Sequence, residues 1–145
     1  MITVLMGAPG AGKSTWLEKN KTGKEHIYNT QPVRTNSEID VNRFMAHIRL
    51  KAAQALEQGL DVVADGTHTR SDHRSYWLRL AIKHEIETKL VIFETPLILL
   101  MEANARRQYP ASYKAITEHH IRRVRSMELV KREGWTTIEI VRRIK

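Results

Sequence analysis

The chain has 145 residues, which is the length of one domain, and it contains no cysteine that could form a disulfide or a thiolate metal site. Its 24 Lys and Arg residues outnumber 16 Asp and Glu residues, and the formal net charge of +8 favours polyanionic partners. No apolar run approaches the roughly 18 residues of a membrane span, so we expect no membrane partner and a reducing, cytoplasmic location.

Apolar runs alternate with longer amphipathic stretches, which is the pattern of a parallel α/β domain. The expected elements, in chain order, are a strand at Ile2–Met6, a helix at Lys13–Asn20, a strand at Glu25–Asn29, a helix at Ile39–Gln58, a strand at Leu60–Ala64, a helix from about Ser71 to His84, a strand at Leu90–Glu94, a helix from Pro96 to about Arg107, a helix at Thr117–Arg132 and a strand at Thr136–Val141. Ser71 and Thr95 are expected to cap the helices that follow them. We predict one α/β domain over residues 1–145, with a parallel five-stranded sheet and helices on both faces.

The turn between the first strand and the first helix matches the phosphate-loop pattern G-x-x-x-x-G-K-[ST] in full. Its glycines let backbone N–H groups turn toward phosphate oxygens, and the positive end of the next helix points at the same charge. Lys13 is expected to reach the β- and γ-phosphates, and Ser14 to offer its hydroxyl to Mg²⁺. We therefore predict a P-loop NTPase or kinase fold that binds ATP and Mg²⁺, with the nucleotide held by Gly7, Ala8, Pro9, Gly10, Ala11, Gly12, Lys13, Ser14 and Thr15.

The third predicted strand is followed directly by a carboxylate, Asp65. In open α/β sheets the ligand lies beyond the carboxyl ends of the strands. Asp65 is therefore expected to face the phosphates, where it would hold Mg²⁺ or its waters, or orient the acceptor. The alternative is an aspartate that only caps a turn or a helix.

Two adjacent arginines, Arg106 and Arg107, end the fourth predicted helix just before an irregular segment. Phosphoryl transfer spreads negative charge over the γ-phosphate oxygens, so a kinase needs cations there. We expect the two arginines either to form part of a lid over the nucleotide or to lie in solvent at the end of the helix.

Over nearly its whole length the chain resembles the 5′-kinase domain of phage polynucleotide kinases, and more loosely other small P-loop kinases. The residues that carry the resemblance are the phosphate loop with Ser14, Thr15 and Trp16, then Asp65, Gly66 and Thr67, then Arg74 and Trp77, and finally Arg106 and Arg107. The resemblance implies a phosphotransferase in the cytoplasm of a phage-infected bacterium.

The same resemblance implies roles for individual side chains. Asp65 would contact the acceptor, with Thr67 and Arg74 beside it. Arg107 would bind the transferring phosphate, with Arg106 next to the nucleotide. An arginine after the second strand binds the acceptor's phosphate in that family, and Arg34 is similar to it in position.

The chain departs from the family at the general base. The family places an aspartate in a D-x-x-R pattern after the second strand, whereas this sequence has Gln31 three positions before Arg34. An amide cannot accept a proton as a carboxylate does. Asp65, Asp40 or Glu38 would then serve as the base, or the reaction proceeds without one; Asp40 also fits a residue that only begins a helix.

Three kinds of function remain open from the sequence. The basic C-terminal third favours a kinase that acts on nucleic acid, DNA or RNA, at a 5′-hydroxyl or at a hydroxymethyl group of a modified base in DNA. The same nucleotide site would also serve a kinase for a nucleoside, nucleotide or sugar. Gln31 motivates the third alternative, a nucleotide-binding module with little transfer activity.

Overall fold

Five parallel strands form one sheet in the computed structural model, which describes residues 1–30 and 38–143. The strands lie side by side in the order β2-β3-β1-β4-β5, and all four neighbouring pairs are parallel. Their bounds are Ile2–Met6 for β1, His26–Asn29 for β2, Val62–Asp65 for β3, Thr88–Glu94 for β4 and Thr137–Arg142 for β5. The predicted five-stranded parallel sheet is confirmed.

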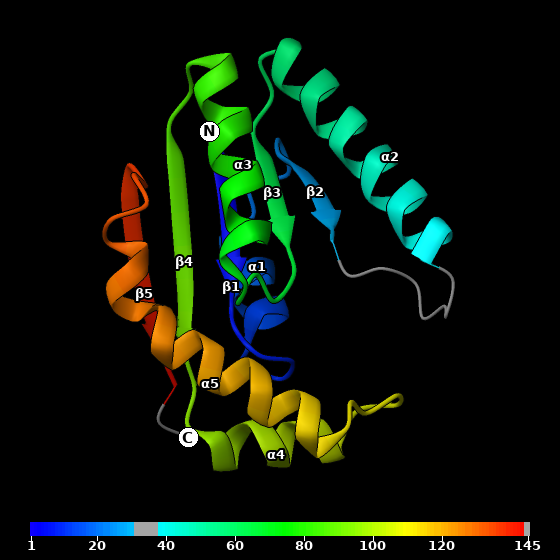
Figure 1. Ribbon diagram of the computed structural model, residues 1–145, viewed down its shortest axis with the longest axis vertical. Helices are drawn as coiled ribbons and strands as arrows, with labels where there is room; N and C mark the ends of the chain where they lie inside the picture. Colours follow the sequence, from blue (N-terminus) through cyan, green and yellow to red (C-terminus); the bar gives the residue numbers. More distant parts are fainter. Residues whose placement is uncertain (31–37, 144–145) are drawn as a thin grey trace.

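Helices cover both faces of the sheet, and two of them also lie across the edge at which the strands end (Figure 1). The helices are α1 at Lys13–Asn20, α2 at Glu38–Glu57, α3 at Ser71–His84, α4 at Leu97–Ala105 and α5 at Tyr113–Val130. α2 and α3 pack on one face and α1 on the other, whereas α4 and α5 lie together at the carboxyl ends of the strands. Within the described residues, no helix is long and apolar enough to cross a membrane.

The core consists of two apolar clusters, one on each face of the sheet. β1 and β4 contribute to both clusters, because strands that are covered on both faces carry nearly continuous apolar sequence. On the face of α2 and α3, Trp77 is the largest fully buried side chain. On the face of α1, Trp16 packs edge-on against Phe93, with ring centroids 6.0 Å apart.

Two predicted helix caps are wrong, and both errors concern short polar side chains. α3 begins at Ser71 itself, after Arg70, and no side chain caps it. α4 follows Pro96, while the Thr95 hydroxyl donates to the distant Ala11 carbonyl, 2.8 Å away. α5 starts four residues earlier than predicted, because Ser112 accepts a hydrogen bond from the backbone N–H of Ala115 and caps it.

The buried strand β4, which pairs with β1 and β5, should contribute strongly to the stability of this fold. Leu90→Ala removes a side chain that is 0% exposed, so we expect it to lower the free energy of unfolding by about 2–5 kcal/mol. Ile82→Ala on α3 is the matched control, because that side chain is 76% exposed and its loss should change stability by less than about 0.5 kcal/mol. Urea denaturation of both variants measures the difference, and equal losses would contradict this account of the core.

Candidate active site

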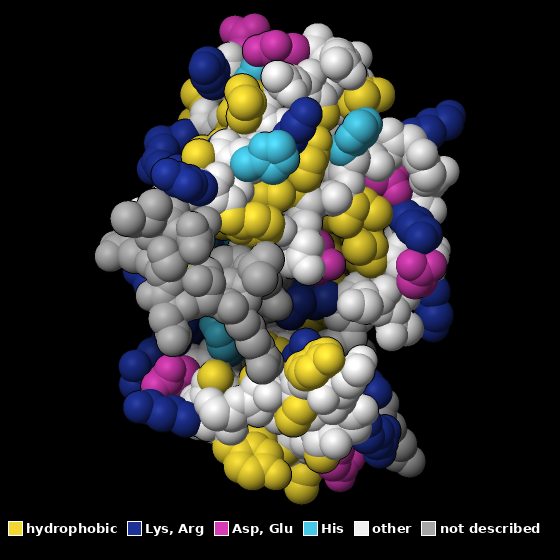
Figure 2. Space-filling model, turned by 90° about the vertical axis from the view of Figure 1, so that its right-hand side faces the viewer, with side chains coloured by type: hydrophobic (Ala, Val, Ile, Leu, Met, Phe, Trp, Pro, Cys, Tyr) yellow, Lys and Arg dark blue, Asp and Glu magenta, His cyan; other side chains and the backbone are white. Residues whose placement is uncertain are grey.

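A polar pocket of about 370 Å³ lies at the carboxyl ends of the strands. Its lining residues come from the phosphate loop, from the ends of β2 and β3, from α4 and the segment after it, and from the end of the chain: Pro9, Gly10, Ala11, Gly12, Lys13, Ser14, Thr15, Asn29, Asp65, Gly66, Ala103, Arg107 and Arg143. Figure 2 shows the molecule hollowed on this side, between the body of the domain and the end formed by α4 and α5. The pocket stands where the ligands of parallel α/β sheets bind.

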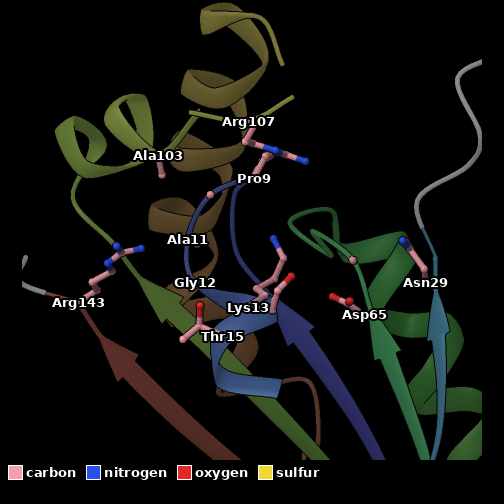
Figure 3. Close-up of a pocket in the computed structure, with 13 residues that line it drawn as sticks. Pro9, Ala11, Gly12, Lys13, Thr15, Asn29, Asp65, Ala103, Arg107 and Arg143 are labelled. Carbon is pink, nitrogen blue, oxygen red and sulfur yellow. The ribbon is translucent and has the colours of Figure 1, made fainter. Parts of the chain in front are cut away.

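Lys13 occupies the middle of the pocket in Figure 3. Its ammonium group donates to the backbone carbonyls of Gly7 and Ala8, at 2.6 and 3.0 Å. Burial lowers the pKa of Lys13 to about 8, the negative charge of Asp65 counteracts this shift, and the positive charge of Arg107 adds to it. The side chain is therefore held inside the loop as a cation that is poorly solvated and attracts an anion strongly.

Contacts from distant parts of the chain fix the shape of the phosphate loop. The backbone N–H of Gly7 donates to the Thr67 carbonyl over 2.9 Å, and Thr95 holds the Ala11 carbonyl. Gly10 has a φ of 85°, in the region that glycine tolerates, and a methyl group placed on it would lie 3.2 Å from Ala103 Cβ. The loop is thus pressed against α4 on one side and joined to the segment after β3 on the other.

Asp65 lies at the end of β3, directly beside Asn29 at the end of β2. Both side chains lie on the same side of Lys13 in Figure 3. Burial raises the pKa of the Asp65 carboxyl, and the charge of Lys13 partly opposes this. A methyl group on Gly66 would lie 2.1 Å from the Thr30 hydroxyl oxygen, so a side chain next to Asp65 would displace the Thr30 hydroxyl.

His68 follows Asp65 in the chain and is a structural residue. Its ring is 3% exposed, and Nδ1 donates to the Leu5 carbonyl at 2.7 Å, because a carbonyl only accepts. Burial lowers the pKa of His68 to about 4, so the ring is neutral at physiological pH. This histidine holds the Asp65 loop against β1.

The segment after α4 brings Arg107 to the pocket, opposite the sheet in Figure 3. Asn104 fixes both ends of this segment with one buried side-chain amide. It donates to the Ala111 carbonyl at 2.8 Å and accepts from the Ala111 backbone N–H at 2.9 Å. The six residues from Ala105 to Pro110, which we call the lid segment, therefore form a loop that is closed at its base.

Arg143 is a pocket residue that the sequence reasoning missed. It directly follows β5, and its backbone N–H donates to the Glu94 carbonyl at 3.3 Å. Figure 3 places it beside Gly12 and Thr15, on the side of Lys13 opposite to Asp65. The rule that pointed to Asp65, a polar residue just after a predicted strand, points first to Arg142 and only then to Arg143, because the predicted strand ends at Val141.

Several residues predicted for the site do not line the pocket. Arg106 is exposed at the end of α4, and Thr67 contributes its backbone carbonyl to Gly7, so their side-chain roles remain predictions. The predicted contact of Arg74 with the acceptor is corrected by the structure. Its side chain is 0% exposed and paired with Glu133 at 2.9 Å, which leaves it no access to a substrate.

The predicted acceptor segment lies outside the described part of the chain. Arg34 and Gln31 fall between residues 31 and 37. Glu38 and Asp40 lie in the first turn of α2, but their side chains are outside the description as well. Asp65 is therefore the one carboxylate that the described residues bring into the pocket.

The fold and this pocket define the class of protein as a domain with the P-loop kinase fold. The profile of the family described as AAA domain matches residues 2–129, so the chain belongs to that family. A search of curated proteins found no match.

Solved structures with the same fold include enzymes and parts of larger chains. A chain of the Pnkp1/Rnl/Hen1 RNA repair complex superposes with a TM-score of 0.77 at 17% identity, covering 88% of this chain and 45% of that one. Deoxyadenosine kinase from M. mycoides with bound dATP gives 0.61 at 9% identity, with 98% and 91% covered. A gluconokinase from Sinorhizobium meliloti 1021 gives 0.64 at 14% identity, with 99% and 82% covered. This chain spans less than half of the length of the RNA-repair chains. The resemblance to P-loop kinases is confirmed at the level of the fold.

The lowered pKa of Lys13 predicts how nucleotide affinity depends on pH. A triphosphate favours the charged ammonium, and the free protein loses this charge above a pH of about 8. The affinity for ATP should therefore be constant below that pH and fall by up to about tenfold per pH unit above it. Binding measured with a fluorescent nucleotide gives the profile. Lys13→Arg should abolish the dependence, because a guanidinium keeps its charge, and an unchanged profile would assign the titration to another group.

Asn104 should act through Arg107. We expect Asn104→Ala to lower the rate of phosphate transfer by about tenfold, since Arg107 loses its fixed position near the developing charge. A double-mutant cycle tests this link, because the same substitution should have less than about a twofold effect in an Arg107→Ala background. Additive effects would contradict it.

Proposed function

We propose that the chain transfers the γ-phosphate of a nucleoside triphosphate to a hydroxyl group on nucleic acid. The observation that carries the proposal is the convergence of an ammonium, a carboxylate and a guanidinium, from Lys13, Asp65 and Arg107, on a single pocket next to a phosphate loop. Asp65 and Arg107 both lie close enough to Lys13 to affect its pKa. Cations on two sides of a triphosphate, with a carboxylate beside them, are what phosphoryl transfer needs.

The phosphate loop binds the triphosphate in this proposal. Backbone N–H groups of the loop and the N-terminus of α1 surround the β-phosphate, and the Lys13 ammonium exchanges its two carbonyl partners for phosphate oxygens. Arg107 approaches from the lid segment and stabilises the charge that spreads over the γ-phosphate oxygens. Arg143 meets the nucleotide on the Thr15 side, away from the acceptor.

Asp65 is our candidate for the group that receives the acceptor. Its raised pKa brings the carboxylate nearer to the pKa of an effective base, and it lies beside Asn29 on the side of Lys13 opposite to Arg143. A dissociative transition state asks little of a base. Orientation of the hydroxyl by Asp65 is therefore sufficient for transfer when position 31 is a glutamine.

Mg²⁺ fits the donor groups of the pocket. Ser14 offers a hydroxyl and Asp65 a carboxylate, and no cluster of three or more His, Cys, Asp or Glu side chains within the described residues forms a metal cage of its own. A magnesium ion is typically held by one or two protein oxygens together with substrate phosphates. Once bound, the ion would neutralise charge on the phosphate oxygens.

Positive charge around the acceptor side favours nucleic acid as the acceptor. Burial is the main cause of the lowered pKa of His73, and the positive charges of Arg70, Arg122 and Arg49 lower it further. These three arginines come from α2, α5 and the start of α3, so the side chains face a common region. Burial likewise lowers the pKa of His119 to about 4, with Arg122 and Lys13 contributing, which connects this region to the pocket.

The acidic residues in this region do not cancel its positive charge. Arg70 pairs with Asp72 and Arg122 with Glu118, but all four side chains are at least 38% exposed and such pairs are weak. The backbone phosphates of a nucleic acid can therefore replace the carboxylates. The fold's likeness to a chain of an RNA repair complex agrees with this proposal, although it shows the fold alone.

A kinase for a small molecule is the second candidate. Deoxyadenosine kinase and gluconokinase share the fold and are covered over 91% and 82% of their lengths. A compact acceptor such as a nucleoside or a sugar would bind in the pocket next to Asn29 and Asp65 without using the arginines outside the pocket.

An acceptor screen with labelled ATP and Mg²⁺ tests the proposal. The acceptors are single-stranded DNA, RNA, hydroxymethyl-modified DNA and mononucleosides. We expect transfer to an oligonucleotide to exceed transfer to a mononucleoside, and its KM to rise with salt concentration because phosphate contacts release counterions. Lys13→Ala is the control for the site, and it should lower transfer by about 100-fold or more.

Each other outcome of the screen has a definite meaning. Transfer to mononucleosides that is equally fast, with no salt dependence for oligonucleotides, would leave only the small-molecule kinase. Binding of ATP without transfer to any acceptor would support a nucleotide-binding module. A Lys13→Ala variant with a near-normal rate would exclude this pocket as the active site.

A further inference from the structure

A buried ion pair lies behind the Asp65 loop, away from the pocket. Arg74, in the first turns of α3, is 0% exposed, and Glu133, between α5 and β5, is 12% exposed. Arg74 Nε and Nη2 donate to the two carboxylate oxygens of Glu133, with the shortest contacts at 3.0 and 2.9 Å. The remaining Nη1 donates to the backbone carbonyl of His68 at 3.0 Å. One guanidinium thus joins α3, the turn before β5 and the segment after β3.

The carbonyl that Arg74 holds belongs to the loop that carries Asp65. Two other anchors of this loop come from the β1 side: the Gly7 backbone N–H bonds to Thr67, and the His68 ring bonds to Leu5. His68 has a φ of 46°, which residues other than glycine rarely adopt, so the loop is kept in this conformation by its surroundings. Arg74 provides the anchor from the opposite side and bonds to the strained residue itself.

The chemistry of the pair indicates a geometric role more than a contribution to stability. Burying two charges costs desolvation free energy, and a well-packed apolar pair of similar volume often stabilises a protein as much or more. The planar guanidinium, by contrast, fixes three acceptor atoms in one plane, which neither an apolar side chain nor a lysine reproduces. Trp135 Nε1 donates to Glu133 Oε1 at 3.0 Å and holds the carboxylate in turn.

We propose that Arg74 and Glu133 are positioning residues, which set the place of Asp65 in the pocket by holding the His68 carbonyl. This inference rests on the proposed function in one respect, namely that Asp65 receives the acceptor. Arg74 would thus act on the reaction indirectly, through the Asp65 loop, whereas the family resemblance predicted that it binds the substrate directly. The pair would then influence the rate of transfer without contacting the nucleotide or the acceptor.

The decisive variant replaces both partners at once. Arg74→Met combined with Glu133→Leu should stay folded, because removing both buried charges together offsets the lost hydrogen bonds to the His68 carbonyl and from Trp135 Nε1. If the pair serves stability alone, this variant transfers phosphate normally. If the pair positions Asp65, kcat falls by about tenfold or more while the affinity for ATP stays within about twofold. Arg79→Lys on the same helix is the control, since that side chain is exposed and should leave kcat unchanged.

Two single variants refine the test. Arg74→Lys keeps the positive charge but loses the paired N–H donors of the guanidinium, whereas Glu133→Gln keeps the shape of the side chain but loses its negative charge. Each should lower kcat in the wild-type background, and each should have less than about a twofold effect when Asp65 is already changed to asparagine. Additive losses in the Asp65→Asn background would overturn the proposal.

A readout without catalysis separates this inference from the proposed function. Backbone amide NMR shifts report the position of the Asp65 loop in the protein without nucleotide. The shifts of Asp65, Gly66 and Thr67 should change in the double variant, because the His68 carbonyl loses its hydrogen bond to Arg74. Changed shifts would support the positioning role even if the wild-type protein transferred phosphate to no acceptor. Unchanged shifts in a folded double variant would overturn the positioning role, whatever the acceptor screen shows.

Discussion

The phosphate loop depends on support from outside its own sequence. Its glycines permit the bend, but three separated parts of the chain hold it: Thr95 bonds to Ala11, Thr67 bonds to Gly7, and α4 packs against Gly10. The supports come from the ends of β3 and β4 and from the helix that follows β4. The parallel sheet brings all of these to one edge, so the remaining features of the pocket follow from the order of the strands.

The carboxyl edge of the sheet also separates two sides of the pocket. β2 and β3 supply Asn29 and Asp65 on one side of Lys13, while β5 supplies Arg143 on the other. Arg107 lies over the loop between them. A triphosphate bound to the loop would therefore present its terminal phosphate toward the carboxylate and its nucleoside toward Arg143. Along the strand order β2-β3-β1-β4-β5, the acceptor is thus expected at the ends of β2 and β3, the phosphates at the end of β1 and the nucleoside at the end of β5.

The sequence predicted the local features well and the long-range partners poorly. β1 and α1 have the predicted bounds, because the phosphate-loop pattern fixes the end of one and the start of the other. Thr95 was misassigned as a cap because its hydroxyl has a partner 84 positions away. Arg74 was assigned to the substrate from the family resemblance, and its partner Glu133 lies 59 positions away. Pairs of that kind leave no periodic signal in a single sequence. For Arg143, the strand-end rule that found Asp65 would have pointed first to its neighbour Arg142, because the predicted strand ended at Val141.

The close approach of Gly10 to Ala103 has a mechanical consequence. A methyl group added to Gly10 would lie 3.2 Å from Ala103 Cβ, so a side chain at position 10 would push the loop and α4 apart. The position of α4 therefore depends on position 10 of the loop remaining a glycine. A bulkier side chain at position 103 would press on the loop at Gly10 and tilt α4. This tilt would move Arg107, which follows α4, although residue 103 itself would not contact a ligand.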